Sequence, residues 1–156
     1  MKLAEALALR SDASRRLEQL RARAQANARY QEGEAPAEDA NQLLAEADRV
    51  LGELEDLIRR INRTNAATAL DEQMTLTDAI ARRDALRLRH ALYTSVADAA
   101  SGKSGPAVVR QMRSELRYLS AVPVSGLRAT ADEIARQHRE LDVRIQRSNW
   151  EADLAD

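Results

Sequence analysis

The sequence of 156 residues contains no cysteine and no phenylalanine, and aromatic residues make up only 3% of it. Without cysteine, a disulfide framework and a thiolate zinc site are both excluded. The scarcity of aromatic side chains leaves leucine, alanine, isoleucine and valine to form the interior, a set that lets helices pack closely side by side. These absences favour a helical bundle.

The chain also lacks a long apolar run and an excess of charge of either sign. No stretch approaches the roughly 18 apolar residues of a membrane span, and Glu5 lies where a signal peptide needs its apolar segment. Charged residues make up 31% of the sequence but nearly cancel, to a net charge of −1. Long-range attraction to nucleic acid or to an anionic lipid surface is therefore not expected. We predict a cytosolic protein that binds no nucleic acid and for which a membrane is not an expected partner.

The most regular pattern in the chain is an alternation of three and four residues between positions 44 and 65, the spacing of a supercoiled helix seam. Its members are Leu44, Ala47, Leu51, Leu54, Ile58, Ile61 and Asn65. Leu43, Val50 and Leu57 each stand one place before a seam position and widen the seam into a face that one partner helix cannot cover. We therefore predict a helix that packs inside a bundle and buries its excess apolar face between copies of the chain.

Helix-forming composition, together with the positions of glycine, proline and capping residues, places four helices in the chain. The predicted helices cover about residues 2–30, 39–68, 76–100 and 126–150. Short connections favour antiparallel neighbours, so the predicted fold class is all-α: an antiparallel four-helix bundle in a single domain of residues 1–156. Residues 107–122 fit an extended chain and a helix equally well, and we favour a short β-hairpin or extended arm there.

A polar motif, Arg-Ile-Asn-Arg-Thr-Asn, occupies residues 60–65 near the end of the second predicted helix. Its Asn65 takes a seam position, where a buried amide fixes the register of packing at some cost in stability. The antiparallel arrangement predicts that this end of the helix faces Asp78, Asn149 and Trp150. A structural role is the first interpretation and a ligand pocket the second. The ring of Trp150 is expected to pack as an apolar plug of the bundle end.

A second polar group, Arg83, Asp84, Arg87 and His90, follows one side of the third predicted helix. Stripes of this kind are usually solvated or ion-paired. If a neighbouring copy or Asp142 covers the stripe, its charges must pair, because an unpaired charge is costly away from water. We expect an ion-pair network here.

His138 and Asp142 share one face of the fourth predicted helix, and His138 lies near the predicted level of His90. Two histidines and a carboxylate could hold a divalent metal. The Glu-x-x-His motif of di-iron bundles is missing at both histidines, because Arg87 and Ala135 stand where the glutamate would be. The first interpretation is therefore no metal, and a site of His90, His138 and Asp142 is the alternative.

Six short motifs occur in order along the chain: Arg-Ile-Asn-Arg-Thr-Asn (60–65), Thr-Leu-Thr-Asp (75–78), Arg-Arg-Asp-Ala-Leu (82–86), Arg-His (89–90), Ser-Glu-Leu-Arg-Tyr (114–118) and Asn-Trp (149–150). This set resembles the septicolysin-like group of small bacterial proteins over nearly the whole chain. The resemblance implies a mainly helical, oligomeric protein, and the name of the group implies a membrane-active cytolysin. The motif positions that it marks are Asn62, Asn65, Asp78, Arg83, Asp84, Arg87, His90, Asp142, Asn149 and Trp150. The chain departs from the group at Pro123, where a capping aspartate is expected, and at His138, which replaces a more ordinary polar residue.

These patterns predict a cytosolic homo-oligomer with a structural or interaction role, no cofactor and no catalytic residue. Two alternatives stay open. One is the membrane-active protein that the resemblance implies, although every predicted helix is densely charged. The other is a small-molecule or metal site where the second, third and fourth predicted helices meet.

Overall fold

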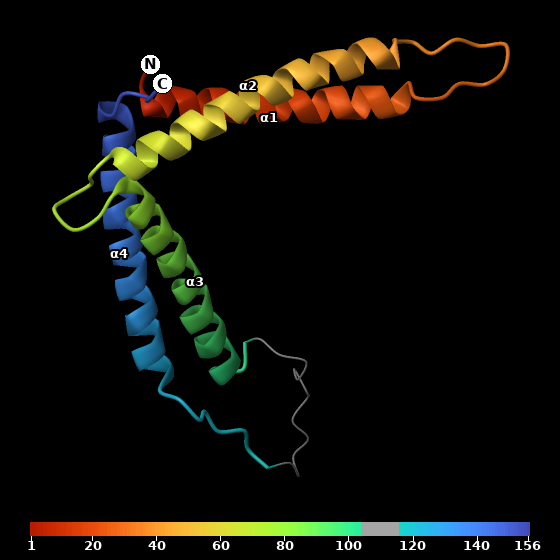
Figure 1. Cartoon of the computed structure of the whole chain (residues 1–156). Helices are drawn as coiled ribbons and strands as arrows, with labels where there is room; N and C mark the ends of the chain where they lie inside the picture. Colours follow the sequence, from red (N-terminus) through yellow and green to blue (C-terminus); the bar gives the residue numbers. More distant parts are fainter. Residues whose placement is uncertain (104–115) are drawn as a thin grey trace. The chain divides into compact units, whose positions relative to one another are not determined.

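The computed structural model describes residues 1–103 and 116–156 and contains four helices (Figure 1). They are α1 (Leu3–Ala26), α2 (Ala40–Ala67), α3 (Leu76–Ala100) and α4 (Val124–Glu151). The helices pack as two antiparallel pairs, α1 with α2 and α3 with α4. The all-α prediction of antiparallel helices is confirmed. None of the helices in the described residues is long and apolar enough to cross a membrane.

The chain divides into two compact units, and α4 contributes to both. One unit consists of Met1–Leu76 with Gln146–Asp156, and the other of Thr77–Ile145. Whether the two units unfold together, as the single-domain prediction implies, stays a prediction.

Local hydrogen bonds explain where the observed helices differ from the predicted ranges. The helix α1 ends four residues early because Asn27 caps it: the Asn27 amide nitrogen donates to the Arg23 carbonyl oxygen at 2.9 Å. The N-terminus of α2 has the expected cap, since the Asp39 carboxylate accepts from the Asn41 N–H at 2.9 Å. The helix α4 begins two residues early, and its first turn is closed by a 3.0 Å bond from the Leu127 N–H to the Pro123 carbonyl oxygen.

The predicted arm at residues 107–122 lies partly outside the described residues. Its described part, residues 116–122, contains neither a helix nor a strand, so no hairpin is seen there. The side chains of Leu116, Tyr118 and Leu119 in this part are exposed.

The core between α1 and α2 is built around Leu20, Leu43 and Val50. Alanines and Leu17 fill the space around these three side chains, which allows the two helices to approach closely. On α2 the residues buried in this core, Leu43 and Val50, are therefore two that widen the predicted seam, and one seam residue, Ile61, is also buried. Three of the seam residues, Leu44, Leu51 and Ile58, are exposed instead.

Candidate functional site

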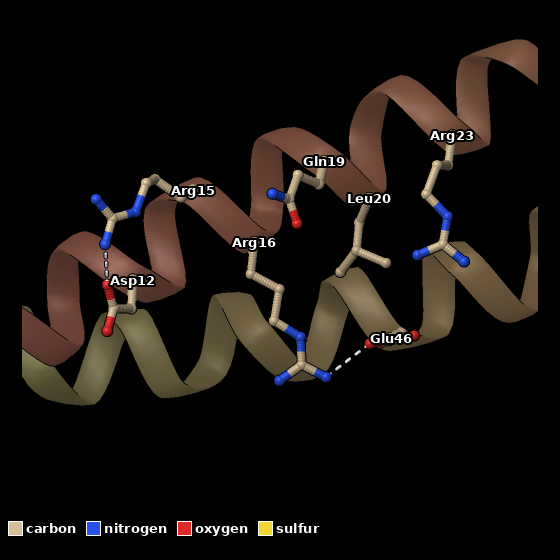
Figure 2. Close-up of a pocket in the computed structure, with 7 residues that line it drawn as sticks. All are labelled: Asp12, Arg15, Arg16, Gln19, Leu20, Arg23 and Glu46. Atoms are coloured by element: carbon tan, nitrogen blue, oxygen red, sulfur yellow. Dashed lines mark hydrogen bonds and ion pairs between the residues drawn. The ribbon is translucent and has the colours of Figure 1, made fainter.

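An arginine-rich groove of about 360 Å³ runs between α1 and α2 (Figure 2). Arg15, Arg16 and Arg23 reach into it from α1. The Arg16 guanidinium crosses to Glu46 of α2 at 2.6 Å, and Arg15 pairs with Asp12 on its own helix. Arg23 binds Glu38 with two hydrogen bonds, of which the one from Nε is 2.9 Å long. Each guanidinium of the groove therefore has a carboxylate partner, and the pair between Arg16 and Glu46 joins the two helices.

These ion pairs shift the titration of their carboxyl groups. The hydrogen bond from the Arg23 guanidinium lowers the pKa of Glu38, and the hydrogen bond from Arg16 lowers the pKa of Glu46. A carboxyl group whose pKa is lower in the folded than in the unfolded chain stabilises the fold above its unfolded value, about 4.3 for glutamate. That contribution is lost as the pH falls through the folded pKa.

We expect the Arg23→Gln substitution to raise the pKa of Glu38 toward the value of an unpaired glutamate, because the substitution removes the charged donor. Glu46 serves as the internal comparison: its pKa should rise less than that of Glu38, because its principal donor, Arg16, is retained and only the weaker charge effect of Arg23 is lost. A pH titration followed by NMR of the side-chain carboxyl carbons measures both groups in one sample. An unchanged Glu38 pKa in the variant would show that the Arg23 pair does not form in solution.

A second polar contact joins the C-terminal segment, residues 152–156, to the start of α1. The Leu3 N–H donates to the Ala152 carbonyl oxygen at 3.0 Å, and the Leu154 N–H donates to the Met1 carbonyl oxygen at 2.9 Å. The Lys2 ammonium binds the Asp153 carboxylate at 2.8 Å and thereby lowers the pKa of that carboxyl group. The Leu154 side chain is buried. The two ends of the described chain are therefore held side by side (Figure 1).

The same segment is also bound by the C-terminal end of α2. Arg60 Nε donates to the Ala155 carbonyl oxygen at 2.8 Å, and Arg63 donates to the Asp156 carbonyl oxygen at 3.1 Å. The hydroxyl of Thr64 accepts the Ala155 N–H at 2.9 Å while donating to the Arg60 carbonyl oxygen at 2.8 Å. The polar motif at residues 60–65 therefore binds the C-terminal segment through Arg60, Arg63 and Thr64.

The prediction that Asn65 fixes the register of packing is not tested by its burial and stays a prediction. Asn62 is exposed and Asn65 is half-buried, whereas Asn149 near the end of α4 is buried. The prediction that Trp150 plugs the end of the bundle is wrong, because 63% of its surface is exposed. Adjacent helical residues point about 100° apart, and the phase of α4 turns Asn149 inward and Trp150 outward.

The predicted ion-pair stripe on α3 forms in part. The Arg83 guanidinium lies 3.1 Å from the Asp84 carboxylate and 3.4 Å from that of Asp142, so it joins α3 to α4. Arg87 is exposed and His90 is half-buried. Asp78 is exposed in the first turn of α3. The prediction of a network that includes Asp142 is confirmed for Arg83, while a binding role for these residues stays a prediction.

We expect Asp84→Ala to lower the free energy of unfolding by less than about 1 kcal/mol, the usual limit for a solvent-exposed ion pair. The Asp84 side chain is 48% exposed, and Arg83 keeps Asp142 as a partner in the variant. Urea denaturation at several protein concentrations measures the change. A loss of about 3–5 kcal/mol would instead show that the pair becomes buried when copies of the chain associate.

The described residues do not gather a metal site. Among residues 1–103 and 116–156, no group of three or more histidine, aspartate or glutamate side chains is placed to hold an ion, so His90, His138 and Asp142 do not form one. In the same residues, no buried side-chain nitrogen or oxygen lacks a hydrogen-bond partner. The polar clusters therefore satisfy one another and present no orphaned group that points to a missing ligand.

Comparison with known proteins gives the chain a family. A profile described as a family of unknown function (DUF6847) matches residues 10–154. The chain belongs to this family. It is also similar to a solved structure described as a functionally unknown conserved protein from Corynebacterium diphtheriae, with 41% identity over 99% of both chains and a TM-score of 0.91. No curated protein matches the chain.

Membership of the DUF6847 family names no activity. The resemblance to the septicolysin-like group, and the cytosolic location, stay predictions.

The contact of the C-terminal segment was not predicted from the sequence, although a signal for it exists. Leu154 is the one large apolar residue after Trp150. An isolated leucine in a short polar segment is a reason to expect that the segment docks on the fold.

Proposed function

We propose that this member of the DUF6847 family is a helical interaction protein that associates with itself through the outer face of α2. This face is defined by Leu44, Leu51 and Ile58, with Asp48 and Glu55 between them. The observation that supports the proposal is the exposure of the three apolar side chains, which is 55%, 45% and 40%.

The arrangement of these residues is that of a helix-packing surface. They recur every seven residues, so they form one stripe along α2 on a side that α1 does not cover. An open depression of about 800 Å³ follows the stripe past Leu51 and Ile58. Single exposed leucines are ordinary, but a contiguous apolar stripe with a polar rim is typical of an interaction site. Because each side chain is already about half covered, burial of its remaining surface stabilises an assembly by roughly 0.7–1.5 kcal/mol.

Light scattering after size exclusion tests the proposal. We expect the wild-type protein to have a multiple of the 17.3 kDa chain mass, and Leu51→Gln to shift the protein toward the monomer. Leu9→Gln is the matched control, because Leu9 is 47% exposed on α1 and lies outside the outer face of α2. A wild-type protein that is monomeric at tens of micromolar would contradict the proposal.

The membrane-active alternative has its own test, which is dye release from liposomes by the purified protein. Its support is the sequence resemblance alone. A small-molecule site likewise has no orphaned polar group among the described residues to support it.

A further inference from the structure

The helix α3 carries a second exposed apolar stripe, on the side opposite its core. Ala79, Leu86 and Ala97 are buried in the unit that α3 forms with α4. Leu88 and Leu92, on roughly the opposite side of the helix, are 67% and 59% exposed, and Val96, about 100° around the helix from Ala97, is 38% exposed. We call this stripe the outer face of α3. Leu88 to Val96 spans about 12 Å of helix, so this stripe can cover about half of the outer face of α2, which spans about 21 Å.

The two outer faces have edges of opposite charge. On α2, Asp48 and Glu55 are seven residues apart and lie beside the exposed leucines. On α3, Arg82 and Arg89 are also seven residues apart and lie beside Leu88. All four side chains are in exposed residues. None of the four has an ion-pair partner among the described residues, whereas the arginines of the groove between α1 and α2 are all paired.

From this complementarity we infer that the outer face of α2 in one copy packs against the outer face of α3 in a second copy, with Asp48 and Glu55 paired to Arg82 and Arg89. The inference rests on the proposed self-association and names the partner surface. Seven residues span about 10.5 Å of helix, so a single register brings both acids opposite both arginines.

Charge also argues against the two simpler pairings. If α2 packed on α2 of another copy, acids would edge both sides of the contact, and if α3 packed on α3, arginines would do so. Like charges that face each other across an interface are unfavourable and exclude wrong partners. The pairing of α2 with α3 is the one that matches both charged edges, and in that register the outer face of α3 covers one end of the longer apolar stripe on α2.

Charge reversal tests the inference. We expect Asp48→Lys with Glu55→Lys, and separately Arg82→Glu with Arg89→Glu, each to raise the dissociation constant for self-association by about tenfold or more, measured by sedimentation velocity. In an equimolar mixture of the two double variants, every contact between α2 of one variant and α3 of the other is again opposite in charge. The mixture should therefore associate about as tightly as the wild type.

The matched control is Arg139→Glu with Arg147→Glu on the exposed side of α4, which lowers the net charge by as much as Arg82→Glu with Arg89→Glu and should leave association unchanged. Circular dichroism confirms that each variant is folded. A wild-type monomer would overturn both the proposed function and this inference. An oligomer that Leu51→Gln dissociates but the charge variants do not affect would overturn the inference alone. Variants that weaken association without rescue in the mixture would also overturn it, because the faces would then not meet between different copies.

Discussion

Leu43→Ala is expected to lower the free energy of unfolding by about 2–5 kcal/mol, the range for a buried leucine that leaves a cavity. Leu44→Ala, one residue further along the same helix, is expected to lower it by less than about 1 kcal/mol, because that side chain is already in water. The two leucines differ in exposure by an order of magnitude, 5% against 55%. Leu43 contributes to the core with Leu20 and Val50. Urea denaturation followed by circular dichroism measures both changes.

The comparison should be made at a protein concentration low enough for the monomer to predominate, since association would add its own stabilisation to Leu44. Both substitutions remove the same atoms from the same helix, so helix propensity cancels between them. If Leu43→Ala and Leu44→Ala lowered the free energy of unfolding equally, α2 would be rotated about its axis relative to this structure, with Leu44 in contact with α1.

The sequence predicts the helix α2 and the width of its apolar face. It does not predict how α2 is rotated about its axis relative to α1. Leucine or isoleucine follows an apolar neighbour in three adjacent pairs, in which Leu43 and Val50 are buried and Leu57 is half-buried. Two apolar stripes therefore run along α2 side by side. Either stripe satisfies a seven-residue repeat. The choice between them is made by α1, which offers a narrow stripe with Leu17 and Leu20, and by the ion pair from Arg16 to Glu46. Periodicity within one helix carries no information about such a partner.

The contacts at the candidate sites likewise include some that helix periodicity predicts and some that it does not. The pairing of Arg83 with Asp142 could be predicted because both lie on regular helices whose antiparallel arrangement fixes their levels. Leu154 signals that residues 152–156 dock, but the surface on which they dock could not be predicted, because the segment follows the last helix and has no repeat to extrapolate. The prediction that Trp150 is buried is wrong because it rests on the hydrophobicity of the side chain, whereas the position of a residue around the helix decides its exposure.

The contact of the C-terminal segment predicts a large effect from one hydroxyl group. Thr64→Val should lower the free energy of unfolding by about 1–3 kcal/mol, since valine has nearly the same shape but leaves the Ala155 N–H without its acceptor. Thr64 is only 3% exposed, so water cannot readily replace the lost oxygen. The amide hydrogens of Leu154 and Ala155 should also exchange faster with solvent, because the segment opens locally at a lower cost.

Thr130→Val on α4 is the matched control for this prediction. The Thr130 hydroxyl makes the same kind of bond within its helix, 3.0 Å to the Gly126 carbonyl oxygen, but Thr130 is exposed, and within residues 1–103 and 116–156 its hydroxyl binds no other segment. Its loss should change the free energy of unfolding by no more than about 0.5 kcal/mol. If Thr64→Val and Thr130→Val lower the free energy of unfolding equally little and the exchange of the Leu154 and Ala155 amides is unchanged, the hydroxyl of Thr64 does not hold the C-terminal segment. Leu154 and the backbone bonds to Met1 and Leu3 would then account for its docking.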